Sequence, residues 1–354
     1  MILLRILLLP FTILYGTAIL LRNFFFQSKI LTRTSFDLPI ICVGNLAAGG
    51  TGKTPHIEWI IRQLKDEYKL GVLSRGYRRK TSGYQFAYPN ATPEEIGDEP
   101  FQIHRKFIDI PVGVAENRVF GIPELLGDAP DTQVVLMDDG YQHLPLKADT
   151  YILLTDYNNL YCDDWLLPSG LLREYRSGAK RAAIIVVTKC PEQLTSVEKE
   201  NIRKKLNPLP SQQLLFSSIV YGKPIAVNAS IELNEQSAVI AFSGIANPKP
   251  LIQYLETHFP GAQHIQFRDH QDYTNTEIER ILSVIKHDPR PNKVLVCTEK
   301  DAVKLGSLSP APFKEIPLFY IPIEISFHDH GAQVLAHYLR TVISSKILEE
   351  SANQ

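Results

Sequence analysis

The strongest constraint on the fold lies in residues 44–54, which read Gly-Asn-Leu-Ala-Ala-Gly-Gly-Thr-Gly-Lys-Thr. They follow the apolar run Ile40–Val43, which predicts a buried strand, and precede His56–Lys65, which has the spacing of an amphipathic helix. A strand, a glycine-rich loop, a Lys-Thr pair and a helix together aim backbone N–H groups and a helix N-terminus at phosphate oxygens. The sequence therefore predicts a phosphate-binding loop with contacts from Ala47, Ala48, Gly49, Gly50, Thr51, Gly52, Lys53 and Thr54.

Two side chains of this loop have expected roles of their own. Lys53 is expected to reach the β- and γ-phosphates, and the Thr54 hydroxyl to bind Mg²⁺. The strict pattern G-x-x-x-x-G-K-[ST] has glycine where this chain has Ala47. A small residue fits there, and Gly49 and Gly50 keep the loop permissive. A glycine-rich turn without a ligand is the structural alternative.

A phosphate loop of this kind needs a carboxylate at the end of a neighbouring strand to hold the water shell of the metal. The apolar run Val134–Met137 ends in Asp138 and Asp139 and supplies this group. Asp138 is the candidate on the metal side and Asp139 is its neighbour. Either carboxylate could instead cap the following turn.

Apolar runs alternate with helical patterns along most of the chain. The runs are Ile40–Val43, Leu70–Leu73, Val134–Met137, Tyr151–Leu154, Ala183–Val187, Ala238–Phe242 and Val294–Cys297. This alternation predicts an α/β fold with a mostly parallel sheet covered by helices. A polar, turn-rich stretch after Ser217 interrupts it, and 354 residues suffice for two domains. We expect a P-loop NTPase-like domain over residues 31–225 and a second, smaller α/β domain over residues 226–345.

Charge and cysteine content exclude several classes. The net charge of −1 argues against a nucleic-acid-binding protein, which usually carries a basic surface. The four cysteines are far apart and form no CxxC pair, so neither a zinc site nor a disulfide framework is indicated, and a reducing cytoplasm is the simplest compartment. Nothing in the sequence reports an oligomeric state.

Residues 1–30 form a separate unit. Of the first 26 residues 19 are apolar, and residues 1–36 carry four basic residues and no acid, which leaves −5 on the remaining 318. A cleaved signal peptide is disfavoured, because no basic cluster precedes the apolar run and no small-x-small cleavage site follows it. A transmembrane span is marginal, because only 16 uncharged residues separate Arg5 from Arg22, whereas a span needs about 20.

A helix that lies in the membrane interface fits this segment better. At about 100° per residue, one sector of about 120° holds Arg5, Thr12, Tyr15, Gly16, Arg22 and Asn23. The rest of the circumference is broadly apolar, and Phe24–Phe26 between Arg22 and Lys29 suit a lipid headgroup boundary. We predict an amphipathic, membrane-associated N-terminal helix. A buried core helix is the alternative.

The loop after Ile184–Val187 bears on the class of nucleotide-binding protein. A GTPase would show [NT]-K-x-D there, but this chain has Thr188-Lys189-Cys190-Pro191 without the Asp, and Thr298-Glu299-Lys300-Asp301 has the wrong spacing. A GTPase is therefore disfavoured. Phosphoryl transfer to a small or lipid acceptor is the leading class.

The combined motifs resemble the tetraacyldisaccharide 4′-kinase family, the lipid A 4′-kinases of Gram-negative bacteria. Beyond the phosphate loop they are Leu73-Ser74-Arg75-Gly76-Tyr77, Gly97-Asp98-Glu99-Pro100, Asp138-Asp139-Gly140-Tyr141-Gln142-His143, Leu167-Pro168-Ser169-Gly170-Leu171-Leu172-Arg173-Glu174, Phe242-Ser243-Gly244-Ile245-Ala246-Asn247-Pro248, Asp269-His270 and Thr298-Glu299-Lys300-Asp301-Ala302-Val303-Lys304. They span residues 44–304 in one order, which is far more specific than a phosphate loop alone.

The resemblance implies transfer of the γ-phosphoryl group of ATP, with Mg²⁺, to the 4′-hydroxyl of a tetraacylated glucosamine disaccharide 1-phosphate, which yields the 1,4′-bisphosphate. It also implies two α/β domains with the nucleotide between them. The acceptor is a lipid A precursor, so the implied location is the cytoplasmic face of the inner membrane, with peripheral or monotopic attachment. This is a step of lipopolysaccharide biosynthesis.

The same resemblance implies roles for particular residues. Asp98 is the candidate catalytic base and His270 the residue that orients it, whereas Arg75, Arg173 and Glu174 are the candidate substrate contacts. Family members often have two histidines at the position of Asp269-His270-Gln271, so only His270 can fill that role here.

Other readings of these residues stay open. Asp98 could be a helix N-cap and His270 a surface histidine, and Glu99 is the rival base. The basic run Arg78–Lys80 is typical of a solvated surface, Asn117-Arg118 is a weaker candidate, and His143 could form a core hydrogen bond instead of meeting the metal's water or the substrate. The alternative functions are a soluble P-loop kinase for a small metabolite and a membrane-tethered ATP-binding scaffold.

Overall fold

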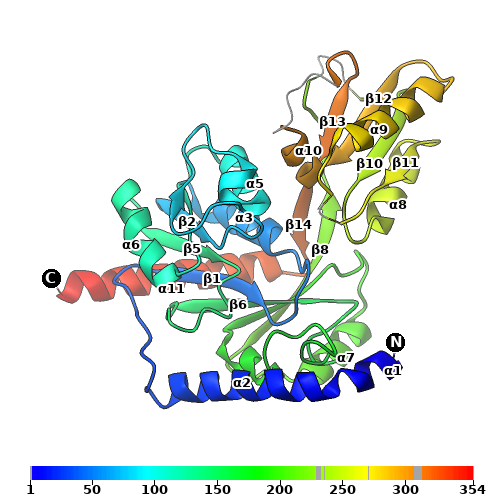
Figure 1. Cartoon of the computed structure of the whole chain (residues 1–354). Helices are drawn as coiled ribbons and strands as arrows, with labels where there is room; N and C mark the ends of the chain where they lie inside the picture. Colours follow the sequence, from blue (N-terminus) through cyan, green and yellow to red (C-terminus); the bar gives the residue numbers. More distant parts are fainter. Residues whose placement is uncertain (1, 229–232, 235, 270, 307–312, 354) are drawn as a thin grey trace.

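The computed structural model describes residues 2–228, 233–234, 236–269, 271–306 and 313–353, and two β-sheets organise them (Figure 1). The strands of the first sheet are β1 (Ile40–Asn45), β2 (Leu70–Ser74), β3 (Gln85–Phe86), β4 (Val112–Val114), β5 (Val134–Asp138), β6 (Thr150–Asp156), β7 (Ile184–Thr188), β8 (Gln213–Tyr221) and β14 (Ile323–Phe327). Their order is β14-β8-β7-β6-β1-β5-β2-β4-β3, and all are parallel except the edge strands β3 and β14.

Helices cover both faces of this first sheet. They are α3 (Lys53–Leu64), α4 (Pro93–Ile96), α5 (Asp98–Lys106), α6 (Arg118–Asp128), the 3₁₀ helix η1 (Arg176–Arg181), α7 (Ser196–Leu206) and α11 (Gly331–Asn353). Successive β1 residues point to opposite faces, so Ile41 packs in one core with α3 and α11, while Cys42 packs in another with α6. Because both faces are buried, the central strands are continuous apolar runs, as the sequence pattern predicts.

The second sheet is smaller and has its own helices. Its strands are β9 (Ile225–Ala226), β10 (Ala238–Ser243), β11 (Gln263–Gln266), β12 (Lys293–Thr298) and β13 (Leu318–Ile321), in the order β11-β10-β12-β13-β9. Its helices are α8 (Lys249–His258), α9 (Asn275–His287) and α10 (Glu299–Gly306). One face of β10 and β12 packs on α9 and the other on α8.

The chain returns to the first sheet before it ends, which differs from the expected second domain over residues 226–345. Strand β14 pairs antiparallel with β8, with Ile325 opposite Ile219, and α11 packs in the core that also holds α3. Burial of Ile325 and Leu339 in that core explains the return. The two crossings between the sheets lie side by side, because the Gly222 N–H donates to the Pro322 carbonyl at 2.9 Å.

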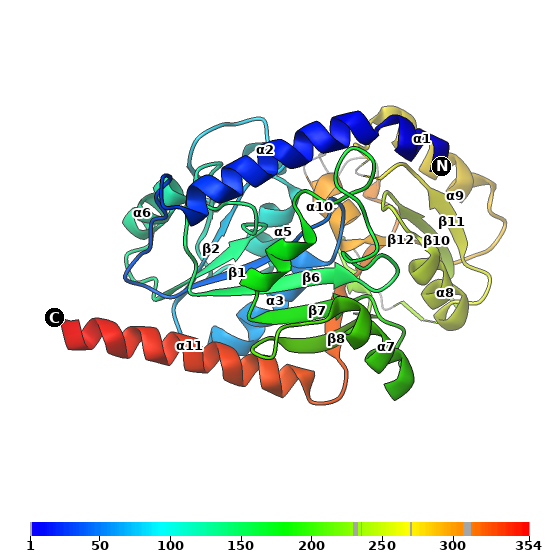
Figure 2. The ribbon, with the colours of Figure 1, turned by 90° about the horizontal axis from the view of Figure 1, so that it is seen from below.

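The N-terminal helices α1 (Ile2–Leu7) and α2 (Leu9–Gln27) lie along one side of the first sheet, away from α11 (Figure 2). The middle of the polar sector predicted for this segment faces the protein, whereas Arg5 is exposed. Thr12 Oγ1 donates to Ser169 Oγ at 2.7 Å, the Tyr15 hydroxyl donates to the Arg173 carbonyl at 2.7 Å, and Gly16 lies against Tyr175. Helix α2 thus docks on the segment of residues 169–175, which includes Arg173.

The apolar side of α2 faces outward. The large exposed apolar side chains are Phe11, Ile13, Leu14, Leu20, Leu21, Phe24 and Phe25. Leu14 is 71% exposed although it lies in the middle of a structured helix. Among the described residues α2 is the one helix long and apolar enough to cross a membrane by length and composition, and only 22% of its apolar stretch is buried inside the protein.

Candidate active site

The phosphate loop joins β1 to α3 with the geometry that its sequence predicts. Gly52 directly precedes α3 and has φ +84°, and Gly49 has φ +116°, a region that favours glycine. A Cβ built on Gly49 or Gly50 would meet no atom within 4 Å, so this part of the loop is open. The N-terminus of α3, with Lys53 as its first residue, faces the loop.

Side chains and neighbouring segments hold the loop in this shape. Asn45 Nδ2 donates to Thr51 Oγ1 at 2.8 Å, and the Thr188 hydroxyl at the end of β7 donates to the Thr51 carbonyl at 2.9 Å. On the other side, the Ala48 N–H donates to the Leu171 carbonyl at 2.7 Å. The segment that docks α2 therefore also contacts the phosphate loop.

The two aspartates at the end of β5 have different surroundings. Asp138 is fully buried, and neither of its carboxylate oxygens has a hydrogen-bond partner in the part of the chain that the structure describes. Burial, with the negative charge of Glu99, raises the pKa of Asp138 to about 8, although Lys53 opposes the shift. Burial would also raise the pKa of Asp139, but Lys53 and Arg173 hold it below its usual range.

Asp139 is the centre of an ion-pair network at the loop. It has φ +50°, and the Arg173 guanidinium donates to its two carboxylate oxygens at 3.0 and 3.2 Å. Lys53 Nζ lies 3.9 Å from Asp139 Oδ2. Arg173 also donates to Asn45 Oδ1, so it connects Asp139 to the end of β1. The structure thus brings Lys53, Asp139 and Arg173 together.

Asp138 fits a divalent cation better than it fits any protein donor. A buried carboxylate with two unpaired oxygens is costly unless a ligand satisfies it. The described residues contain no group of three or more His, Cys, Asp or Glu side chains that could hold a metal by themselves. This donor set matches Mg²⁺, which usually keeps waters and phosphate oxygens in its shell and takes only one or two protein ligands. Thr54, buried at the start of α3, is the other candidate ligand.

Asp98 and Glu99 begin α5 and face different neighbours. Gly97, with φ +93°, turns the chain into this helix. Asp98 Oδ2 lies 3.6 Å from Lys304 Nζ, which α10 of the second domain supplies. Glu99, by contrast, acts electrostatically on Asp138. His270 lies outside the described residues, so its predicted orienting role stays a prediction.

A group of basic residues lies beside the aspartates. Arg118 is buried and donates to the Asp139 carbonyl at 3.1 Å. Burial, together with the charges of Arg118 and Arg75, lowers the pKa of His143 to about 4. His143 Nε2 is buried and has no hydrogen-bond partner among the described residues. Arg75 is exposed at the end of β2, which leaves its guanidinium accessible to an anionic ligand.

The structure differs from the prediction that Glu174 contacts substrate. Its side chain is fully buried, and Arg181 donates to its two carboxylate oxygens at 2.6 and 3.1 Å. A carboxylate enclosed by protein donors cannot reach a ligand, so the role of Glu174 is to hold Arg181 and Gln142 in place. Gln142, which donates to both Glu174 and the Asn45 carbonyl, links this pair to the end of β1.

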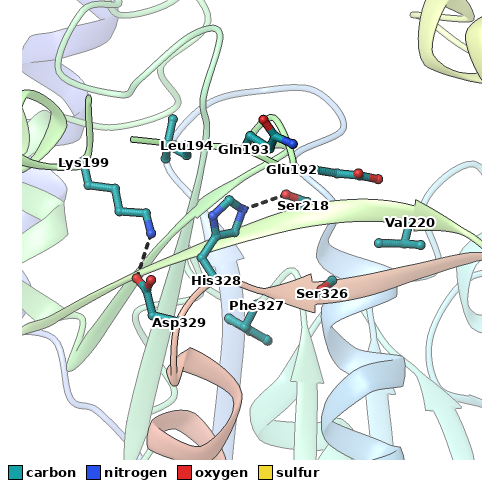
Figure 3. A pocket seen from close by; sticks show the side chains of 10 residues that line it. All are labelled: Glu192, Gln193, Leu194, Lys199, Ser218, Val220, Ser326, Phe327, His328 and Asp329. Carbon is teal, nitrogen blue, oxygen red and sulfur yellow. Dashed lines mark hydrogen bonds and ion pairs between the residues drawn. The ribbon is translucent and has the colours of Figure 1, made fainter. Parts of the chain in front are cut away.

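A pocket of about 430 Å³ opens beside the ends of β7 and β8 (Figure 3). Its lining includes residues 192–194, Val220 and the 326–329 segment at the end of β14. His328 Nε2 lies 2.7 Å from Ser218 Oγ. Strand β7, which separates the pocket from β6 and β1 in the sheet, reaches the phosphate loop through Thr188.

Comparison with known proteins identifies the group to which this site belongs. A model of the tetraacyldisaccharide-1-P 4′-kinase family matches residues 4–343. The chain belongs to this family. The tetraacyldisaccharide 4′-kinase of Flavobacterium johnsoniae is 44% identical over 333 residues, which cover 93% of this chain and 94% of the relative. That of Bacteroides thetaiotaomicron is 39% identical over 364 residues, 97% and 96% of the two chains.

A solved structure has the same fold. The crystal structure of the "apo" form of LpxK from Aquifex aeolicus in complex with ATP is 25% identical, with a TM-score of 0.75 over 96% of this chain and 99% of that one. The α/β architecture expected for the 4′-kinase family is thereby confirmed.

Two members of the site are named in the sequence analysis without an assigned role: Lys304 within a motif and Arg118 as a weaker candidate. Lys304 closes the matched motif Thr298–Lys304, but nothing in that motif says which carboxylate it meets. Arg118 belongs to the Asn117-Arg118 pair, in which the Asn117 side chain caps α6 and thereby sets where the buried arginine begins the helix. The contacts of Lys304 with Asp98 and of Arg118 with Asp139 join segments that are separate in the sequence. The only sequence signal for these two residues is that each lies in a short motif.

Proposed function

We propose that the chain transfers the γ-phosphoryl group of ATP to the 4′-hydroxyl of a tetraacylated glucosamine disaccharide 1-phosphate. The observation that carries this proposal is the phosphate loop, whose Lys53 acts electrostatically on the buried Asp138, a carboxylate without a hydrogen-bond partner among the described residues. Phosphorus NMR after incubation with ATP and the acylated disaccharide tests it, because a new sugar monophosphate ester must accompany ADP. ADP without that ester, or transfer only to a water-soluble sugar, would contradict it and support an ATP-binding scaffold or a small-metabolite kinase.

The proposed mechanism is in-line transfer. The bond from the 4′-oxygen to the γ-phosphorus forms while the bond from that phosphorus to the ADP oxygen breaks, and Asp98 accepts the hydroxyl proton as the transition state develops. Lys53 and the N–H groups of the loop stabilise the charge on the phosphate oxygens. Arg173, already paired with Asp139 at the loop, is positioned to add a further donor.

Mg²⁺ completes the proposed site. Asp138 and Thr54 would hold it, and it would neutralise charge on the β- and γ-phosphates. Asp139 keeps Lys53 and Arg173 in place through its low pKa and its two ion pairs. The exposed Arg75 is the proposed partner of the anionic 1-phosphate of the acceptor.

We assign the nucleobase to the pocket beside β7 and β8. Ligands of open α/β sheets lie outside the carboxyl ends of the strands, and this pocket adjoins the strand whose terminal Thr188 touches the phosphate loop. Val220 lines it and is 36% exposed, so a larger side chain there fills the space without entering the core.

Val220→Trp should raise the KM for ATP about tenfold, equivalent to about 1.4 kcal/mol of lost binding, and should leave the KM for the lipid acceptor unchanged. Steady-state kinetics with each substrate varied in turn measures both values. Val220→Ala is the matched control and should bind ATP normally. An unchanged KM for ATP in the tryptophan variant would place the nucleobase elsewhere.

The outward apolar face of α2 supports a membrane surface as the working place of the enzyme. Its Thr12 and Tyr15 hydroxyl groups bond to the rest of the protein, while Phe11 and Leu14 are exposed. A helix with this arrangement buries its apolar side in the headgroup region of a bilayer. The segment of residues 169–175, on which α2 docks, also contacts the phosphate loop through Leu171. A membrane bound by α2 would therefore lie near the site and present an acceptor with four acyl chains to it.

Replacing Phe11 and Leu14 together by glutamate should weaken binding to anionic phospholipid vesicles at least about tenfold, because each apolar side chain contributes about 1.5–3 kcal/mol when buried. The KM for the lipid acceptor should rise as binding to the vesicles weakens. Vesicle flotation and steady-state kinetics measure the two effects. Ile108→Glu, a change at a site 83% exposed after α5, is the control. Unchanged vesicle binding in the double variant would contradict membrane docking through α2.

A further inference from the structure

Helix α5 of the first domain and helix α10 of the second are joined by ion pairs at both ends. Asp98, the first residue of α5, lies 3.6 Å from Lys304, near the end of α10. Lys106, the last residue of α5, lies 2.8 Å from Glu299, the first residue of α10. The two helices therefore run antiparallel, and each pair places an acid at a helix N-terminus and a cation near a helix C-terminus, the favourable arrangement for both dipoles.

Lys304 is held firmly enough to fix the position of its partner. Its side chain is 8% exposed, and Nζ donates to the Gln271 carbonyl at 2.9 Å. It also lies 3.8 Å from Asp272, but that carboxylate is 95% exposed, whereas Asp98 is 23% exposed. Solvent weakens the pair with Asp272 much more than the pair with Asp98, so of these two described carboxylates Asp98 is the stronger electrostatic partner of Lys304.

We propose that Lys304 is a positioning residue for the catalytic base. Anchored on the Gln271 carbonyl, its ammonium group holds the Asp98 carboxylate in place and favours its charged form. The base is therefore complete only when the second domain lies against α5. This inference rests on the proposed function of Asp98 and adds to it the residue through which the second domain controls that function.

Among the described residues, the other charged groups near Asp98 have partners of their own. Glu99 follows Asp98 on α5 and acts on Asp138, and Lys300 of α10 lies 3.8 Å from Asp269. Burial lowers the pKa of Lys300, with Asp269 and Glu99 opposing the shift more strongly than Asp98 does. The ion pair of Lys300 within the described part of the chain is therefore with Asp269.

The test compares Lys304→Met with Lys304→Arg in the full-length enzyme. The methionine variant should lose about tenfold to a hundredfold in kcat, the size of a proton-transfer contribution, with the KM for ATP unchanged. The acid limb of its pH profile should move up by about one pH unit, because removal of a nearby cation makes a carboxylate easier to protonate. Arginine keeps the charge and should restore the limb. If Lys304→Met does not fold, Lys304→Gln provides the same neutralisation with a donor for the Gln271 carbonyl.

Glu299→Gln is the matched control, because it neutralises the ion pair at the other end of the same two helices. It should leave the acid limb in place. A limb that moves equally in Glu299→Gln and Lys304→Met, or in neither, would overturn the proposal and reduce Lys304 to an interface residue.

An Asp98→Asn background separates this inference from the one it rests on. If Lys304 acts through Asp98, then Lys304→Met causes no further loss of kcat once Asp98 is Asn. If the loss of kcat in the double variant equals the product of the losses in the two single variants, the positioning role of Lys304 is overturned and the role of Asp98 is not. Normal turnover of the single variant Asp98→Asn would instead overturn the assignment of the base.

Discussion

Lys53→Met should lower the rate of ATP-dependent phosphorylation of the acylated disaccharide by at least about a hundredfold to a thousandfold, the effect of removing one preorganised electrostatic contact to a transition state. Lys53 is the first residue of α3, and its ammonium group lies 3.9 Å from Asp139. It is the cation positioned for the β- and γ-phosphates, where charge develops during transfer. Methionine keeps most of the volume of the side chain and removes its charge. The initial rate of phosphate transfer from radiolabelled ATP measures the effect.

The control for this variant is Lys65→Met, which removes the same charge at the other end of α3. Lys65 is exposed and caps the helix through its backbone. It should retain full activity, because its charge lies far from the loop. Full activity in Lys53→Met would refute the assignment of residues 44–54 as the nucleotide phosphate site. Loss of activity in both variants would show that any loss of charge on α3 impairs the enzyme, and not the loss of the contact between Lys53 and the phosphates.

The local part of this site is predictable from the sequence because neighbouring residues determine it. Gly49 and Gly52 sit where the loop requires positive φ, and Lys53 begins the helix directly after them. The position of Asp138 is also predictable, because the carboxyl ends of parallel strands meet at one edge of a sheet, and β1 and β5 are neighbours. Apolar runs indicate such strands without specifying their order.

Contacts between distant segments are not predictable in this way. Glu174 lies in a motif with Arg173, and the resemblance implies substrate contact for both, but burial against Arg181 removes it from the surface. The return of β14 to the first sheet depends on antiparallel pairing with β8, about 100 residues earlier. No periodicity in a short strand reveals its partner.

For the N-terminal helix, the sequence predicts the two faces but not which of them packs on the protein. Its periodicity predicts a polar sector with Thr12 and Tyr15 at about 100° per residue, and the structure has these side chains on one side. Amphipathicity alone does not say whether the polar or the apolar side meets the protein. Here hydroxyl groups find partners on the 169–173 segment, and the apolar side is left outward.

Asp98→Asn should lower kcat by more than about a hundredfold, because proton transfer by a positioned base contributes 10²–10⁴-fold, while nucleotide affinity stays nearly unchanged. The amide has the shape of the carboxylate and cannot accept the proton of the 4′-hydroxyl. Asp98 begins α5 at a distance of 3.6 Å from Lys304 and is not among the residues that form the phosphate loop. Steady-state kinetics over a range of pH, with a separate measurement of ATP binding by calorimetry, tests both parts of the expectation.

Glu99→Gln is the matched comparison, because it makes the same change one residue further along the helix. Glu99 acts on Asp138, which is the candidate metal ligand. Its loss should therefore change the Mg²⁺ dependence of the reaction and leave the acid limb of the pH profile in place, whereas Asp98→Asn should abolish that limb. Reversal of the two results would make Glu99 the base. Asp98 lies 3.6 Å from Lys304 of α10, whereas the charge of Glu99 acts on Asp138, so we expect the two adjacent carboxylates of α5 to affect proton transfer and cation binding differently.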